Sequence, residues 1–320
     1  MVELETFEEL EAHVAGRDAE VFVAYGANTS AKHEPCTLPR IVAAAPRACV
    51  ESTQGGFRVG EWVRTWSDDD YAAAVENVRA AIKRGDVYQV NLVQHLSAPF
   101  SGDARAVARA LGRLHTHSFA GDGWGIVSAT PELFLARRGD RLWTKPIKGT
   151  RPLGEDVDDD KDAAEHVMIV DLERNDLSRV CLPGTIRWPE LMRQHELAGV
   201  THLVSTVEGR LRPDVGLAEI LHATFPGGSI TGAPKLAAID HIARLEPVGR
   251  GASMGAIGRV WANGDLELAL TIRTFVVADG RIHLWVGGGI VWDSDPEAEI
   301  EESWVKARPL LAAVGGLVTA

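Results

Sequence analysis

The chain has 320 residues, of which 45% are hydrophobic, and a formal net charge of −12. A chain of this length can bury a large core, as one big domain or as two modest ones. The acidic balance argues against broad binding to nucleic acid or to anionic membranes, because both require clustered basic residues. An anionic ligand would therefore need a local cationic site.

The cysteines and the N-terminus bear on the cellular compartment. Cys36, Cys49 and Cys181 are odd in number and not closely paired, so the sequence predicts neither a disulfide framework nor a thiolate metal site. The N-terminus lacks the basic and apolar regions of a signal peptide, and no apolar run is long enough to span a bilayer. We therefore expect a cytoplasmic protein in a reducing compartment, with no membrane partner.

The first part of the chain is short and irregular. Two strand-like pieces, VFVAY and CVEST, are separated by a segment that contains Pro35, Pro39 and Pro46. Such a segment is too small to fold alone. We expect residues 1–64 to pack as a shortened N-terminal segment on a domain of residues 65–320.

A helix followed directly by a strand comes next. Ser67 is a candidate N-cap before DDDYAAAVENVRAAIKRG, which has acids in its first turn, and Gly85 marks its end. In the strand DVYQVNLVQHL, Gln89 and Asn91 share a mostly polar face, because alternate residues of a strand point to the same side.

The later elements favour a mixed fold with antiparallel sheets. We expect strands in WGIVSAT, LFLARR, LELALTIRTFVVA and RIHLWVGGGIV, and helices at about 161–180, 216–224, 234–245 and 296–314. The Asp279-Gly280 pair between the last two strands predicts a hairpin. Helices and strands do not alternate regularly, so we predict the α+β class.

Two helices carry acidic faces. Glu299, Glu302 and Lys306 fall on one stripe of the last helix, and Asp162 and Glu165 lie three residues apart on an earlier one. Acids in a first helical turn are often explained by the helix dipole alone. If the two faces met, however, their oxygen ligands would suit Mg²⁺ together with an anionic substrate.

Three further segments have features of a binding site. In FPGGSITGAPK, paired glycines lead into a helix that Pro234 is expected to open, so free N–H groups could bind an anion or simply form a turn. Arg273 is expected to share a strand face with Thr271 and Ala269, where it would bind a carboxylate or remain on the surface. The glycines 287–289 predict either a close approach by a backbone or ligand, or a bulge.

A set of collinear motifs is far more specific than any one of these signals. The motifs are GDVYQVNL, PELFL, PIKGTRPLG, EHVMIVDLERNDLSRVC, THLVSTVEGRL, FPGGSITGAPK, TIRTF and GGGIVWDSDPEAEIEES. From about Trp66 onward the chain resembles the chorismate-binding enzymes, which include anthranilate, aminodeoxychorismate, isochorismate and salicylate synthases. The resemblance implies a Mg²⁺-dependent fold in which two large antiparallel β-sheets, flanked by helices, enclose chorismate.

The resemblance also implies a substrate and metal site. Glu165 and Glu302 would hold Mg²⁺, with Asp162 and Glu299 around them, and the metal would bridge to the ring carboxylate. Arg273 and the backbone near Gly287 would bind the enolpyruvyl carboxylate. The other residues implied to line the site are Lys306, His202, Ser229, Thr231, Gly149 and Thr150.

Three positions indicate the reaction. Glu132 matches the family's general acid and base, which helps the C4 hydroxyl to leave. Lys148, in the PIKGT form of its motif, is similar to the nucleophile of aminodeoxychorismate synthase component I, whereas the other synthases have a small residue there. Gln89 stands where isochorismate and salicylate synthases use a lysine to activate water, and a glutamine cannot act as that base. The resemblance therefore implies amination of chorismate at C4 through a covalent Lys148 intermediate.

The resemblance implies partners as well. Nothing in the sequence resembles the catalytic Cys and His elements of a glutamine amidotransferase, so a separate subunit would supply ammonia. The product would pass to an aminodeoxychorismate lyase, towards 4-aminobenzoate and folate. The alternatives are anthranilate synthase component I, which Lys148 disfavours, and a non-catalytic chorismate-binding or partner subunit. The departures Leu153, where GTRPRG is usual, and Ser253, where an aromatic residue is common, support the second alternative.

Overall fold

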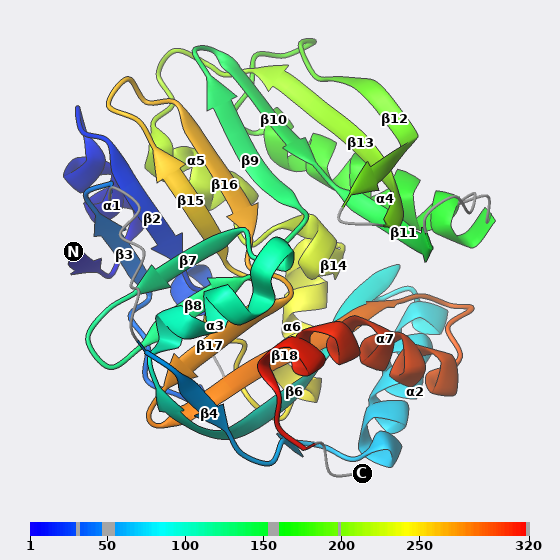
Figure 1. Ribbon diagram of the computed structural model, residues 1–320. Helices are drawn as coiled ribbons and strands as arrows, with labels where there is room; N and C mark the ends of the chain where they lie inside the picture. Colours follow the sequence, from blue (N-terminus) through cyan, green and yellow to red (C-terminus); the bar gives the residue numbers. More distant parts are fainter. Residues whose placement is uncertain (30–32, 47–54, 153–159, 198–199, 318–320) are drawn as a thin grey trace.

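Two antiparallel sheets and the helices around them make up the fold (Figure 1). The computed structural model describes residues 1–29, 33–46, 55–152, 160–197 and 200–317. Every pairing between the described strands is antiparallel. The predicted α+β class with two antiparallel sheets is thus confirmed.

The first sheet contains ten of the described strands. In spatial order they are β1 (Val2–Leu4), β3 (Ile41–Ala44), β2 (Ala19–Val23), β15 (Ala256–Val260), β16 (Leu266–Leu270), β9 (Leu133–Arg138), β10 (Arg141–Lys145), β13 (Val200–Arg210) and β11 (Ile147–Pro152), with β12 (Arg187–Leu197) also paired to β13. The helices α1 (Phe7–Val14), α4 (Asp160–Ser178) and α5 (Leu217–Thr224) pack against this sheet and one another.

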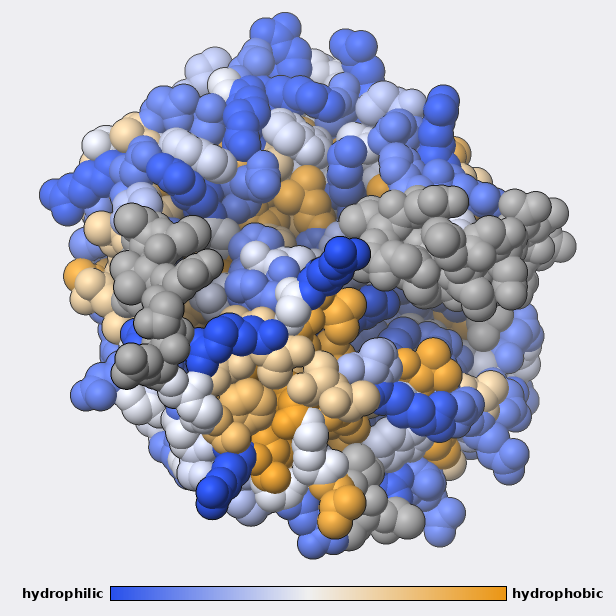
Figure 2. Space-filling view, viewed as in Figure 1, coloured by the Kyte–Doolittle hydropathy of each residue, from blue (hydrophilic) through white to orange (hydrophobic). Residues whose placement is uncertain are grey.

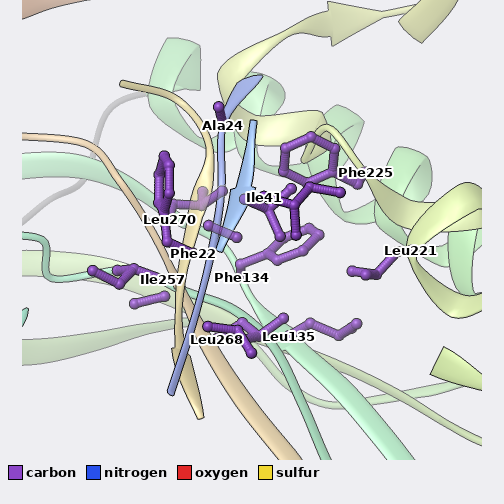
Figure 3. Packing of buried hydrophobic residues seen from close by; sticks show 14 of the residues in the cluster. Phe22, Ala24, Ile41, Phe134, Leu135, Leu221, Phe225, Ile257, Leu268 and Leu270 are labelled. Carbon is purple, nitrogen blue, oxygen red and sulfur yellow. The ribbon is translucent and has the colours of Figure 1, made fainter. Parts of the chain in front are cut away.

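The main core lies between the first sheet and these helices. Figure 3 shows its centre, where Phe22 of β2, Phe134 and Leu135 of β9, and Leu268 of β16 meet Phe225 at the end of α5. The Phe22 side chain is fully buried. Each such side chain contributes about 1.5–3 kcal/mol by leaving water. This packing therefore holds in place the strands of the first sheet on which site residues lie.

The second sheet contains eight of the strands that the structure describes. They are β14 (Gly232–Ala233), β6 (Gln89–Gly102), β18 (Arg281–Ile290), β17 (Thr274–Ala278), β8 (Gly125–Ser128) and β7 (His117–Ala120), with β4 (Phe57–Val59) and β5 (Val63–Arg64) also paired to β6. Its helices are α2 (Asp68–Arg84), α3 (Ala104–Leu111), α6 (Lys235–Leu245) and α7 (Pro296–Val314). Figure 2 shows hydrophobic residues gathered below the centre of the view, over this half of the molecule.

Local sequence signals explain most helix ends. Ser67 and Asp70 form a reciprocal capping box at the start of α2, and Gly85 ends the helix with a φ of 81°. The predicted helix at 234–245 is α6, but Pro234 is its N-cap and not its first residue. Ala233, in the short strand β14, pairs with β6, and Pro234 continues this extended backbone with a ψ of 142°.

The segment LELALTIRTFVVA is two strands and not one. β16 belongs to the first sheet and β17 to the second, and residues 271–273 connect them. Thr271 holds the break, since its Oγ1 accepts a 2.7 Å hydrogen bond from the backbone N–H of Gly255. The prediction that Arg273 shares a strand face with Thr271 and Ala269 is therefore wrong. Arg273 lies in the connection between the sheets, with a φ of 50°.

The N-terminal residues contribute to both sheets. The first three residues of VFVAY lie on β2, which pairs with β15 far along the chain, while β4 and β5 pair with β6. CVEST lies outside the described residues. The division of the chain after residue 64 stays a prediction.

The described part of the chain contains seven α-helices and two cysteines. There, no helix combines the length and the apolar character that crossing a membrane requires. Cys36 and Cys181 are buried free thiols, and Cys49 falls outside the described part. Burial raises the pKa of the Cys36 thiol to about 12, so it is uncharged at neutral pH.

Candidate active site

The predicted site residues come from both sheets and from the segments that join them. Lys148 and His202 lie on β11 and β13 of the first sheet, whereas Gly287 lies on β18 of the second. Arg273 lies in the connection between β16 and β17, and Ser229 in the short 3₁₀ helix η3 (Gly228–Ile230). The segments that carry them are thus far apart in the sequence and belong to both sheets, whose arrangement Figure 1 shows.

A β-bulge sets the position of Lys148. β11 and β13 pair through Lys148 and Leu203, and the register shifts before Thr150 pairs with His202. Gly149, between them, has a φ of 56°, a conformation that glycine adopts without steric cost. Bulges of this kind change the direction of a side chain next to a site. The Thr150 side chain lies outside the described part.

His202 is buried next to this bulge, with 1% of its surface exposed. Burial, and then the charge of Arg273, lower the pKa of His202, while a hydrogen bond with the backbone of Gly149 opposes them. The imidazole is thus favoured in its neutral form, beside the strand that carries Lys148. The predicted location of His202 beside the reacting ring stays a prediction.

Glu132 is buried at the start of β9 and is surrounded by other predicted site residues. Burial raises its pKa above the usual carboxyl range. A hydrogen bond from Ser229, the charge of Lys148, the backbone N–H of Ile147 and the charge of Arg273 act in the opposite direction. The structure thus brings Glu132, Lys148, Ser229 and Arg273 together. A carboxyl with a raised pKa is suited to hold and donate a proton.

His166 also belongs to this group, and the residue pattern did not identify it. It is fully buried on α4, where its Nε2 and the Ser205 Oγ share a hydrogen bond of 2.6 Å. Burial and the charge of Lys148 lower the pKa of His166 to about 4, so the imidazole is neutral at neutral pH. Its position next to Glu165 in EHVMIVDLERND was the available signal.

The segment around Ser229 is held by its own hydrogen bonds. The Thr231 hydroxyl is fully buried and donates to the Gly227 carbonyl at 2.8 Å. The Thr231 carbonyl accepts a 2.8 Å hydrogen bond from the backbone N–H of Asn91 on β6. Thr231 therefore fixes the segment to the second sheet, and its predicted contact with substrate stays untested.

The glycine run on β18 is explained by close approach. The register with β6 continues without a shift from Arg281 to Ile290, so the alternative of a bulge is wrong. A Cβ at Gly287 would lie 1.9 Å from the Leu92 carbonyl oxygen, and one at Gly289 would lie 1.7 Å from the Gln89 Nε2. Gln89 is thus packed directly on β18.

Gly288, the middle glycine of this run, faces two carboxylates. A Cβ at Gly288 would lie 3.1 Å from the Glu302 Oε1 and 3.3 Å from the Glu299 Oε2, both on α7. The Ser294 hydroxyl donates to the Glu299 Oε1 at 2.6 Å. The Lys306 Nζ donates to the Glu302 Oε1 at 2.6 Å and to the Gly287 carbonyl at 2.9 Å. Two carboxylates that converge over a bare backbone fit the oxygen ligands that Mg²⁺ prefers.

The other predicted metal ligands lie on α4. Glu165 is partly buried there, next to His166, and the Asp162 side chain lies outside the described part. Among the described residues, no three His, Cys, Asp or Glu side chains gather into a metal-binding group. The pairing of Glu165 with Glu302 through Mg²⁺ stays a prediction.

Of the two departures from the resembled pattern, Ser253 lies within the described part of the chain. Ser253 is fully buried, with its Oγ 3.5 Å from the Thr271 carbonyl oxygen. It therefore supports the turn at which the chain leaves the first sheet. Leu153 lies outside the described residues.

Several known proteins are similar to this chain over most of its length. The family described as chorismate binding enzyme matches residues 7–312. The chain is 42% identical over 277 residues to anthranilate synthase component 1 of Thermus thermophilus, covering 81% of this chain and 60% of that protein. It is 40% identical over 265 residues to aminodeoxychorismate synthase component 1 of Klebsiella aerogenes, covering 78% of this chain and 59% of that protein.

A solved structure shares the fold. The crystal structure of anthranilate synthase component I from Streptococcus pneumoniae TIGR4 matches with a TM-score of 0.77 at 26% identity. The match covers 91% of this chain and 80% of the other. By contrast, the chain spans less than two thirds of the length of the two relatives described above.

Proposed function

The chain belongs to the family of chorismate binding enzymes, and on that premise we propose that it aminates chorismate at C4 to give 4-amino-4-deoxychorismate. The observation that carries the proposal is the placement of Lys148 near the buried carboxyl of Glu132. A nucleophilic amine and a proton donor are the two groups that displacement of a hydroxyl requires. Relatives named aminodeoxychorismate synthase component 1 support the same reaction.

The proposed reaction has two displacement steps. The neutral Lys148 amine attacks C2, the ring double bond shifts, and the C4 hydroxyl leaves as water with a proton from Glu132. Ammonia then attacks C4, the double bond shifts back, and the bond between C2 and the lysine nitrogen breaks. Protons released by the two amines return Glu132 and Lys148 to their starting forms. The sum is chorismate plus ammonia giving 4-amino-4-deoxychorismate plus water.

The remaining site residues would bind and orient the substrate. Glu165 and Glu302, with Asp162 and Glu299 nearby, would hold Mg²⁺, which when bound supplies positive charge to the ring carboxylate. Arg273 and the backbone at Gly287 would bind the enolpyruvyl carboxylate. Lys306 donates hydrogen bonds to both the Glu302 carboxylate and the Gly287 carbonyl. It would therefore connect the metal ligands with the backbone that binds the enolpyruvyl carboxylate.

The source of ammonia and the fate of the product complete the proposal. A separate glutamine amidotransferase subunit would deliver ammonia, and an aminodeoxychorismate lyase would convert the product to 4-aminobenzoate, towards folate. We place these steps in the cytoplasm. Excess ammonium salt should replace glutamine and the partner subunit.

A second candidate is anthranilate synthase component I, because relatives with that name are 38% and 42% identical to the chain. That reaction aminates C2 and then eliminates pyruvate. An amine at Lys148 would compete with ammonia for C2, which disfavours this candidate. Gln89 in turn disfavours attack by water at C2, because a neutral amide cannot accept the proton.

Product analysis tests the proposal. The protein is incubated with chorismate, Mg²⁺ and ammonium at mildly alkaline pH, and the products are identified by mass spectrometry. We expect an aminated product that keeps the enolpyruvyl group and that an aminodeoxychorismate lyase converts to 4-aminobenzoate. Anthranilate as the product would refute C4 amination. Bound chorismate without turnover would favour a non-catalytic subunit.

A further inference from the structure

A buried acid on α4 contacts the segment that carries Ser229. Glu173 is 4% exposed, and its Oε1 accepts a 3.1 Å hydrogen bond from the backbone N–H of Gly228. A Cβ at Gly228 would lie 2.7 Å from the Leu172 Cδ2 and 3.0 Å from the Glu173 Oε1. The helix thus packs directly on this segment, with no space for a side chain between them.

The contact reaches Glu132 through one residue. Gly228 precedes Ser229, whose side chain makes a hydrogen bond with the Glu132 carboxyl. The charge of Glu132 in turn acts on Glu173. Both carboxyls therefore contact the same short segment, Glu173 at Gly228 and Glu132 at Ser229.

The charged groups around Glu173 do not balance. Asp176 faces it from the same helix, Glu132 from the start of β9, and Lys235 from α6. Lys235 is already engaged, since its Nζ donates to the Asp176 carboxylate and to the Thr224 carbonyl at 2.9 Å. Arg179 also acts on Asp176. Glu173 and Asp176 therefore share the ammonium of Lys235, whereas Glu132 has Lys148 and Arg273 beside it.

This imbalance favours an uncharged Glu173. Burial and then the charge of Asp176 raise its pKa, as does the charge of Glu132, while Lys235 and the Gly228 N–H lower it. The resulting pKa is about 8, so Glu173 keeps its proton at neutral pH. A neutral carboxyl can still accept the Gly228 hydrogen bond through its carbonyl oxygen.

We propose that Glu173 is a positioning residue for Glu132. The uncharged Glu173 side chain holds the backbone of Gly228 and thereby keeps Ser229 against Glu132, the general acid and base. The inference rests on the proposed function, in which Glu132 transfers a proton at C4. Ionised Glu173 would add a negative charge next to Glu132 and to a substrate that is itself a dianion. The rate should then fall as Glu173 loses its proton.

The kinetic test compares two variants with the wild-type protein across about pH 6 to about pH 10. Glu173→Gln keeps an acceptor for Gly228 without a charge, so we expect a wild-type rate at neutral pH and no loss of rate near pH 8. Glu173→Ala removes the acceptor, and we expect kcat to fall about 100-fold at all pH values, with little change in the KM for chorismate. Asp171→Asn is the matched control, because Asp171 pairs with Arg174 on the exposed side of the same helix.

An infrared titration of the protonated carboxyl band provides a readout without turnover. We expect a carboxyl in the wild-type protein that loses its proton near pH 8, and no such transition in Glu173→Gln. In Glu132→Gln the transition should move to lower pH, because the charge of Glu132 raises the pKa of Glu173.

The outcomes separate the two proposals. A Glu173→Gln variant with the wild-type pH profile, or an infrared transition that Glu132→Gln leaves in place, would overturn the role of Glu173. A wild-type protein that makes no 4-amino-4-deoxychorismate would refute the proposed function instead. In that case the infrared titration would still show whether Glu173 is protonated at neutral pH and whether its pKa depends on Glu132.

Discussion

The Glu132 carboxyl and the Lys148 amine lie within electrostatic reach of each other, although β9 and β11 are not neighbours in the first sheet. β10 and β13 lie between these strands, so the contact forms at their ends. The N–H of Ile147, which precedes Lys148, also reaches the Glu132 carboxyl. The Glu132 carboxyl thus interacts with β11 through a backbone hydrogen bond and through the charge of Lys148, the proposed nucleophile.

Removal of the proton donor should slow the reaction without preventing substrate binding. In Glu132→Gln we expect kcat to fall by about 10²–10⁴-fold, the range for loss of a general acid, with a smaller change in KM. Steady-state assays with ammonium measure both. Glu190→Gln is a suitable control, because Glu190 pairs with Lys145 at 3.9 Å on a more exposed part of the sheet. Equal kcat values in the two variants would contradict a role for Glu132.

Glu173 should also make stability depend on pH. Its pKa in the folded protein is about 8, above the ordinary value of 4.5 that the unfolded chain would have. The stability gained with the proton is therefore complete below about pH 4.5 and is lost as pH rises through about 8. Urea unfolding should show the wild-type free energy of unfolding decreasing relative to Glu173→Gln across this window. Parallel curves for the two proteins would refute the raised pKa.

The fold was predictable from the sequence where local pattern decides structure. The capping box of α2 and the acidic and apolar stripes of α7 can be read from a few adjacent residues, and both helices were predicted at nearly their observed bounds. The break between β16 and β17 could not be read in the same way. Alternating apolar residues continue across it, and pairing with distant strands decides where the chain changes sheets.

The site was predictable to a similar degree. Long motifs identified Glu132 and Lys148, because their neighbours along the chain are distinctive. Glu173 and His166 lie inside one of these motifs, but their properties depend on burial and on groups from other elements. A residue pattern does not show which groups surround a side chain in the fold. The properties of Glu173 and His166 could therefore be recognised only from the structure.

The acidic face of α7 should control the response to Mg²⁺. In Glu302→Gln we expect the Mg²⁺ concentration for half-maximal activity to rise more than about 100-fold, beyond the effect of losing an outer partner. Excess chelator should abolish wild-type activity. The matched control is Glu301→Gln, since Glu301 is exposed on the same helix and pairs with Arg308 at 2.6 Å. An unchanged Mg²⁺ response in Glu302→Gln would exclude Glu302 as a ligand.

Gly288 should be needed because it leaves space for the two carboxylates. In Gly288→Ala the new methyl group would contact Glu302 and Glu299 at 3.1 and 3.3 Å, and the carboxylates would have to move. We expect the Mg²⁺ requirement to rise about 10-fold, as measured by Mg²⁺ titration of activity. Gly56→Ala is the control, because a Cβ at Gly56 would meet nothing within 4 Å. Identical titrations for the two variants would show that the carboxylates do not need this space.

The proposed mechanism requires Lys148 to form a covalent bond with the ring of chorismate. Without ammonia the second displacement cannot occur, so the lysine adduct should accumulate. Intact-mass spectrometry of the protein with chorismate and Mg²⁺ measures it, and peptide mapping locates it. We expect a mass increase of one chorismate less one water on Lys148, no such increase in Lys148→Ala, and a rate in that variant lower by about 10⁴-fold or more. Undiminished C4 amination by Lys148→Ala would exclude Lys148 as the nucleophile.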